Sequence, residues 1–137
     1  MYQFYFLSIV LNLLAGIALA YDAIDEKLSL SAFFNRDLFS RQGFRLSLGI
    51  ATAIVGFFKL LSVTSGNVPV VGDLLPALIG LILGGSLLAL YYQERSSVTG
   101  PIIQSIDNIF LKNRAVFGIL GIITAILHFL FPSVLFL

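Results

Sequence analysis

Four long apolar stretches run along the chain and are separated by short polar connections. They cover approximately residues 2–21, 46–63, 74–92 and 115–137. Each stretch has close to the roughly 20 mostly apolar residues that a helix needs to cross a bilayer core of about 30 Å. The alternation of apolar and polar residues that marks a membrane barrel strand does not occur. The pattern therefore predicts an all-α integral membrane protein, built as a bundle of four transmembrane helices.

The first and third connections each contain a short amphipathic segment. In residues 29–39, leucines and phenylalanines recur at helical spacing, and Asn35, Arg36 and Asp37 fall on the opposite face. The segment after Pro101 repeats this arrangement, and proline suits the first position of a helix. We therefore expect short interfacial helices in loops 1 and 3.

Composition supports a membrane protein. The chain is 58% hydrophobic and 11% charged, whereas soluble domains carry about a quarter charged residues. A net charge of +1 gives no reason to expect nucleic acid as a partner, and the absence of cysteine excludes disulfides and thiolate metal sites. The connections are too short for a second domain, so residues 1–137 form a single transmembrane domain.

Basic residues predict how the helices are oriented in the membrane. The second connection has only Lys59 at its edge, while all the others lie on the first and third: Lys27, Arg36, Arg41, Arg45, Arg95, Lys112 and Arg114. Cytoplasmic loops carry an excess of Lys and Arg. We therefore expect a multi-pass protein of the cell membrane with both termini outside the cytoplasm.

Five of these cations are candidate contacts to lipids or to a partner at the cytoplasmic surface: Arg36, Arg41, Arg45, Lys112 and Arg114. In one interpretation they form a charged rim that faces anionic membrane lipids, and in the other they dock a cytosolic partner. The acidic residues at positions 22, 25 and 26 should pair with Arg36, Arg41 or Arg45.

Two parts of the chain resemble each other at a constant separation. Arg45, Gly49 and Lys59 recur 69 residues later as Arg114, Gly118 and His128. This favours two tandem helical hairpins, with repeat units 1–68 and 70–137. Such parallel repeats are related by an axis along the membrane normal, unlike the inverted repeats of many transporters.

Every predicted span contains small residues four positions apart, which let neighbouring helices approach closely. The candidate packing positions are Gly49, Ala53, Gly56, Gly80, Gly84, Gly121 and Ala125. They favour close helix packing, either within the bundle or between subunits.

Three polar residues within the spans are candidates for a functional role. Asn12 should hydrogen-bond another helix or contact a ligand. Lys59 lies about 21 Å along a helix from Arg45, so we expect its ammonium group to reach the outer membrane interface. His128 precedes Pro132 by four residues, which predicts a kink and an interfacial hydrogen bond there. Asp73 is expected to cap the third span.

The sequence carries no recognisable catalytic motif. It lacks a phosphate-binding loop, HExxH and Gly-x-Ser-x-Gly, and a single histidine without ligand partners is weak evidence for a metal. This argues against an enzyme, and we predict no cofactor. The leading hypothesis is a structural, assembly or interaction subunit that acts by helix packing, as a homo-oligomer or beside another membrane protein.

Two other functions are open at this point. A small-solute or ion channel or transporter would use a polar path along Asn12, Thr52 and Thr124, and a dry bundle interior would contradict it. A lipid- or quinone-binding protein would place Lys59, His128 or the cytoplasmic arginines at a head group.

Overall fold

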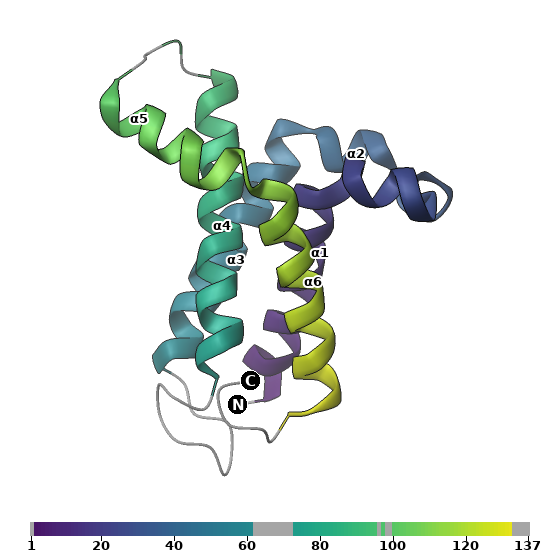
Figure 1. Ribbon diagram of the computed structural model, residues 1–137. Coiled ribbons are helices and arrows are strands. Elements are labelled where there is room, and N and C mark those ends of the chain that lie inside the picture. Colours follow the sequence, from purple (N-terminus) through teal and green to yellow (C-terminus); the bar gives the residue numbers. More distant parts are fainter. Residues whose placement is uncertain (1, 62–72, 96, 98–99, 133–137) are drawn as a thin grey trace.

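The computed structural model describes residues 2–61, 73–95, 97 and 100–132. This part of the chain is helical and forms a bundle of four long helices (Figure 1). The long helices are α1 (Tyr2–Leu28), α3 (Gln42–Leu61), α4 (Leu74–Arg95) and α6 (Arg114–Leu130).

Three of these helices, α1, α3 and α4, are long and apolar enough to cross a membrane by themselves. The shorter α6 qualifies only together with the helical segment before it, α5 (Pro101–Ile106) and η2 (Asp107–Leu111), from which it is bent by 49°. The predicted all-α membrane bundle is confirmed, with three or four helices able to span the bilayer. The end of the predicted fourth span, residues 133–137, lies outside the described residues.

The helices pack as two close pairs, α1 with α6 and α3 with α4 (Figure 1). Further contacts of α1 and α4 with each other and with the opposite pair join the two pairs into one bundle. Leu83 and Leu87 of α4 are completely buried at the centre, beside Ala15 and Leu19 of α1. Apolar side chains therefore fill the middle of the bundle.

Helix α1 continues seven residues beyond the predicted end of the first span. The acidic residues at positions 22, 25 and 26 form its last turns, and the helix ends at Leu28. The next residue, Ser29, adopts a left-handed conformation with φ of 52°, and its N–H donates to the carbonyl of Asp25 at 3.0 Å. The apolar run thus marks the part suited to the membrane, whereas good helix formers such as Glu26 and Lys27 extend the helix itself.

Both predicted loop helices are present, although the first is divided. The predicted segment 29–39 is covered by the short turn η1 (Leu30–Ala32) and then by α2 (Arg36–Ser40), which ends one residue beyond it. Asn35 separates them because its side chain accepts a hydrogen bond from the N–H of Asp37 and so begins a new helix. In the third connection, Pro101 starts α5 as expected. Segments α2 and α5 lie at the same end of the bundle (Figure 1).

Small residues lie where the paired helices approach most closely. A Cβ atom added at Gly118 of α6 would lie 2.6 Å from the carbonyl oxygen of Gly16 in α1. One added at Gly84 of α4 would lie 2.7 Å from the backbone nitrogen of Ala53 in α3, and Gly49 faces the same contact. These close approaches hold the bundle together from within one chain.

Other small residues also face the interior. Gly56 lies against the backbone of α4, Gly80 lies beside the Asn12 side chain, and Gly121 lies against Leu83. Ala125 is buried too. The candidate packing residues thus contact helices of their own chain.

The two helix pairs are those that a tandem duplication would relate. If the two units are repeats, α1 is equivalent to α4 and α3 is equivalent to α6. The packed pair of α1 and α6 is then equivalent to the packed pair of α4 and α3. The contact of Gly49 with Gly84 then corresponds to that of Gly118 with Gly16. In this comparison the equivalent glycines of α3 and α6, Gly49 and Gly118, are 69 residues apart, whereas those of α1 and α4, Gly16 and Gly84, are one residue closer in the sequence. The internal repeat remains a prediction, and parallel repeats would give this arrangement.

Candidate functional site

The charged side chains of the chain fall into two groups. All Asp, Glu, Lys and Arg residues lie within residues 22–45 and 94–114, apart from Lys59 and Asp73. We call the bundle end with Arg36, Arg45 and Arg114 the arginine end. The opposite end, where Lys59, Asp73 and His128 meet, is called the histidine end.

A buried ion pair forms the centre of the histidine end. The ammonium Nζ of Lys59 lies 2.8 Å from Oδ2 of Asp73, and the two side chains are only 1% and 3% exposed. The ammonium group of Lys59 is therefore buried inside the protein and does not extend into solvent, while its expected depth at the outer interface stays a prediction. Asp73 gives it a partner inside the protein, and a charge removed from water needs such a partner.

His128 completes this cluster from helix α6. Its side chain is fully buried, and its Nε2 lies 4.0 Å from Oδ1 of Asp73. The ring of Tyr5 packs edge-on against the imidazole of His128, and the two ring centroids are 4.7 Å apart. The ammonium of Lys59 also lies over the Tyr5 ring, 5.4 Å from the centroid of that ring. Four segments of the chain thus contribute to one site: α1, α3, the residue before α4, and α6.

The end of α6 differs from the expected kink. The helix ends at Leu130, so Pro132 follows it instead of bending it. Proline has no N–H to donate to the carbonyl four residues earlier, which belongs to His128. The hydroxyl of Tyr5 donates to this carbonyl at 2.8 Å and thereby satisfies it from another helix.

The role of Asp73 as a partner of Lys59 is absent from the sequence-based interpretation. Its backbone carbonyl accepts the first hydrogen bond of α4, from the N–H of Ala77, while its carboxylate faces Lys59. One feature of the sequence could have indicated that Asp73 is the partner of Lys59. Lys59, Asp73 and His128 are the only Asp, Glu, Lys, Arg or His side chains outside the two charged segments, and all lie near helix ends that the predicted topology places on one side.

Two of the polar residues in the bundle interior, Asn12 and Thr52, bond to nearby backbone. The Nδ2 of Asn12 donates to the carbonyl of Pro76 at 3.0 Å, which joins α1 to α4. The hydroxyl of Thr52 donates to the carbonyl of Leu48 within α3, and Thr124 is buried as well. With Leu83 completely buried between the helices, these groups do not form a continuous polar path through the described residues.

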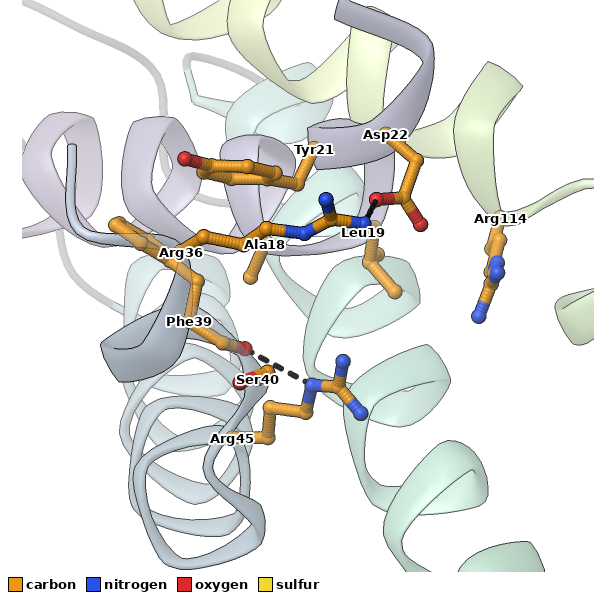
Figure 2. A pocket seen from close by; sticks show the side chains of 9 residues that line it. All are labelled: Ala18, Leu19, Tyr21, Asp22, Arg36, Phe39, Ser40, Arg45 and Arg114. Carbon is orange, nitrogen blue, oxygen red and sulfur yellow. Dashed lines mark hydrogen bonds and ion pairs between the residues drawn. The ribbon is translucent and has the colours of Figure 1, made fainter. Parts of the chain in front are cut away.

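The arginine end contains a pocket of about 120 Å³ (Figure 2). Arg45 lies on one side of the pocket, and two interactions hold its guanidinium group in place. Its Nε donates to the carbonyl of Phe39 at 3.0 Å, and its Nη1 lies 2.7 Å from the carboxylate of Glu94 on α4. The pocket is lined by Ala18, Leu19, Tyr21, Asp22, Arg36, Phe39, Ser40, Arg45 and Arg114.

The other two arginines that line the pocket, Arg36 and Arg114, differ from each other in their hydrogen bonds and ion pairs. Arg36 pairs with Asp22 at 2.9 Å, as expected, and both side chains are largely exposed. Arg45 pairs with Glu94 on α4 instead of an acidic residue near position 25. Arg114 lines the pocket from the start of α6 and makes no hydrogen bond or ion pair within the part of the chain that the structure describes (Figure 2). Its guanidinium donors are therefore available to a ligand.

The two remaining candidate cations lie outside this pocket. Arg41 and Lys112 are exposed and do not line it. Within the described residues, no group of three or more His, Asp or Glu side chains could hold a metal ion. The chemistry available at the arginine end is thus the binding of an anion by guanidinium groups.

Comparison with known proteins places this chain in a family without assigning an activity. A family model matches residues 1–128, nearly the whole chain. The chain belongs to this family of unknown function. No curated protein and no solved structure matches it. Any function must therefore be argued from the two charged ends of the bundle.

Proposed function

We propose that this chain is a non-enzymatic, multi-pass membrane protein whose arginine end binds an anionic lipid head group. One observation carries the proposal. Arg45 and Arg114, which begin the two similar segments 69 residues apart, line the same pocket. A duplication that keeps a cation at equivalent positions would place both beside one ligand.

The bonding of the two arginines suits an anion between them. Arg45 is only 17% exposed, and its bonds to Phe39 and Glu94 fix its guanidinium before any ligand arrives. Arg114 keeps its donors unused by the described protein. A phosphate group accepts two parallel hydrogen bonds from a guanidinium, which is why arginine is common at phosphate sites.

The location of the pocket also supports a lipid as the ligand. It lies at the end of the bundle that carries α2 and α5 (Figure 1). In a membrane-spanning bundle, the helix ends lie at the depth of the lipid head groups. The excess of basic residues at this end favours its location in the cytoplasm, where the leaflet is rich in anionic lipids.

The other functions have less support. The filled interior around Leu83 and Leu87, with Asn12 bonded to backbone, argues against a channel or transporter path. A homo-oligomer or assembly subunit remains a second proposal. Its interface would lie on other surfaces, because the small residues at Gly16, Gly49, Gly84 and Gly118 already contact helices of their own chain.

The proposal is tested by lipid-dependent stability of the protein in detergent. Phosphatidylglycerol should raise the midpoint of thermal unfolding more than phosphatidylcholine does. Arg114→Gln should remove most of this difference, because it removes the guanidinium with unused donors. Lys112→Gln is the matched control, since it deletes an exposed cation outside the pocket.

The outcomes separate the possible sources of the effect. Equal stabilisation by both lipids, or an equal loss in both variants, would contradict a specific site at Arg114. Inorganic phosphate is tested in parallel. If phosphate alone reproduces the full effect, the ligand is a free anion and the lipid proposal is wrong.

A further inference from the structure

An apolar groove of about 590 Å³ lies between α1, the turn η1 and α6. Leucines and isoleucines form most of its lining, and Ala23 is the smallest side chain in it. Ile119 and Ile123 of α6 are 41% and 48% exposed, so the groove is open to the surroundings of the bundle. Its volume is within the usual range of ligand sites, and hydrocarbon chains surround such a surface in a membrane-spanning bundle.

The charged side chains of the groove show which part of a lipid suits it. Glu26 and Lys27 line it from the last turn of α1, and both are exposed. Their charges have opposite signs, so together they give an anion no net attraction. The groove therefore suits a hydrocarbon chain, while the binding of an anionic head group depends on the arginine end.

The groove and the arginine pocket lie on neighbouring faces of α1. Asp22 lines the pocket, and the next residue, Ala23, lines the groove. Successive residues point about 100° apart around a helix. Helix α6 also contributes to both, with Arg114 in the pocket and Ile119 in the groove, about 7.5 Å further along the helix. A head group in the pocket would therefore have its acyl chains close to the groove.

We propose that this groove holds an acyl chain of the anionic phospholipid whose head group binds at the arginine end. The inference rests on the proposed function and adds the part of the ligand that the arginines do not contact. From Lys27 to Leu13 the groove extends about 21 Å along α1, whereas one leaflet contributes about 15 Å of hydrocarbon. The groove is thus long enough for one chain.

The two parts of the site have different roles in binding. Lipid tails are as apolar as the groove, so moving a chain from the bilayer into it brings no hydrophobic gain. The preference for one lipid over another comes from the head group, and the groove fixes where the chain of that lipid lies. Residues of the groove should therefore contact anionic lipid more often than equally exposed residues elsewhere do.

Photo-crosslinking of the wild-type chain in phosphatidylcholine liposomes tests this contact. A trace of phosphatidylglycerol with a diazirine in one acyl chain is compared with phosphatidylcholine that carries the same chain, and adducts are mapped by mass spectrometry. Adducts at Ile119 and Ile123 should form about fivefold more from phosphatidylglycerol. Ile50 and Ile54 of α3 are the matched controls, because they are 43% and 49% exposed, lie outside the groove and precede the two groove residues by 69 positions. They should show no such preference.

A variant that fills the groove gives a second test. Ala23→Phe should lower the phosphatidylglycerol adducts at Ile119 and Ile123 to the level of phosphatidylcholine. It leaves both arginines of the pocket in place, so the difference in thermal stabilisation between the two lipids should persist. Ala32→Phe makes the same change at an exposed position of η1 outside the groove and should alter neither measurement.

The outcomes distinguish this inference from the proposed function. Equal adduct yields from the two lipids at the groove, in a protein that phosphatidylglycerol still stabilises more, would overturn the groove alone. A preference that persists in Ala23→Phe would overturn it as well. If that variant fails to fold, the wild-type comparison decides. Adducts at Ile50 and Ile54 without any at Ile119 and Ile123 would mean that protein covers the groove, which also contradicts the inference. Equal thermal stabilisation by the two lipids would instead contradict the proposed function.

Discussion

Lys59 and Asp73 form an ion pair between α3 and the start of α4, with 2.8 Å between Nζ and Oδ2 and almost no exposure of either side chain. Removing two charges from water costs several kcal/mol for each ion, which their attraction offsets only while both are present. The pair therefore makes the bundle sensitive to the loss of one partner and much less sensitive to the loss of both.

Lys59→Met should destabilise the bundle by about 3 kcal/mol, because the Asp73 carboxylate loses its cation. The double variant Lys59→Met with Asp73→Leu should recover most of this loss. Unfolding in mixed detergent micelles measures both values. Lys112→Met, at an exposed position, is the control and should change stability by no more than about 0.5 kcal/mol. A double variant as unstable as the single one would contradict this account.

Gly84→Ala should destabilise the contact between α3 and α4 by about 2 kcal/mol, because the added methyl group would lie 2.7 Å from the backbone nitrogen of Ala53. Gly43→Ala is the matched control in α3. Nothing lies within 4 Å of a Cβ there, so it should be neutral or stabilising by up to about 1 kcal/mol. The same unfolding assay compares them, and equal effects would count against the close helix approach.

Tyr5→Phe should lower stability by about 1 kcal/mol, since it removes the hydroxyl that donates to the carbonyl of His128 while keeping the ring. Tyr92→Phe removes a hydroxyl from a half-exposed residue and should have little effect. Combining Tyr5→Phe with Pro132→Ala gives a further test. Alanine restores an N–H that can serve the same carbonyl, so the double variant should regain part of the loss.

Single-cysteine labelling tests the predicted orientation. Gln104→Cys, at an exposed position of α5, should react with a membrane-impermeant maleimide only after the cell membrane is opened. Asn67→Cys, in the connection between α3 and α4, should react in intact cells. The reverse pattern would invert the topology, and would also place the arginine end outside the cytoplasm.

The general fold could be predicted from the sequence because a bilayer imposes strong rules on length and hydropathy. Four apolar stretches gave the four long helices, and Pro101 marked the start of α5. The end of α1 could not be predicted in this way. Hydropathy reports which residues suit lipid, whereas the helix continues through Asp22 and Glu26 until Ser29 takes a left-handed conformation.

The histidine end was harder to predict because its contacts join residues far apart in the sequence. Lys59 and Asp73 are separated by residues 60–72, and Tyr5 and His128 by most of the chain. Taken alone, each residue has an ordinary explanation: a snorkelling lysine, a helix cap, an aromatic belt and an interfacial histidine. Only the packing of all four helices brings them together.

The segments α2 and α5 project from the bundle at the same end, in different directions (Figure 1). If they lie in the head-group layer, each copy of the protein occupies more area in one leaflet than in the other. The molecule would then act as a wedge, and many copies gathered in one region would favour a membrane curved toward the narrower end of the bundle.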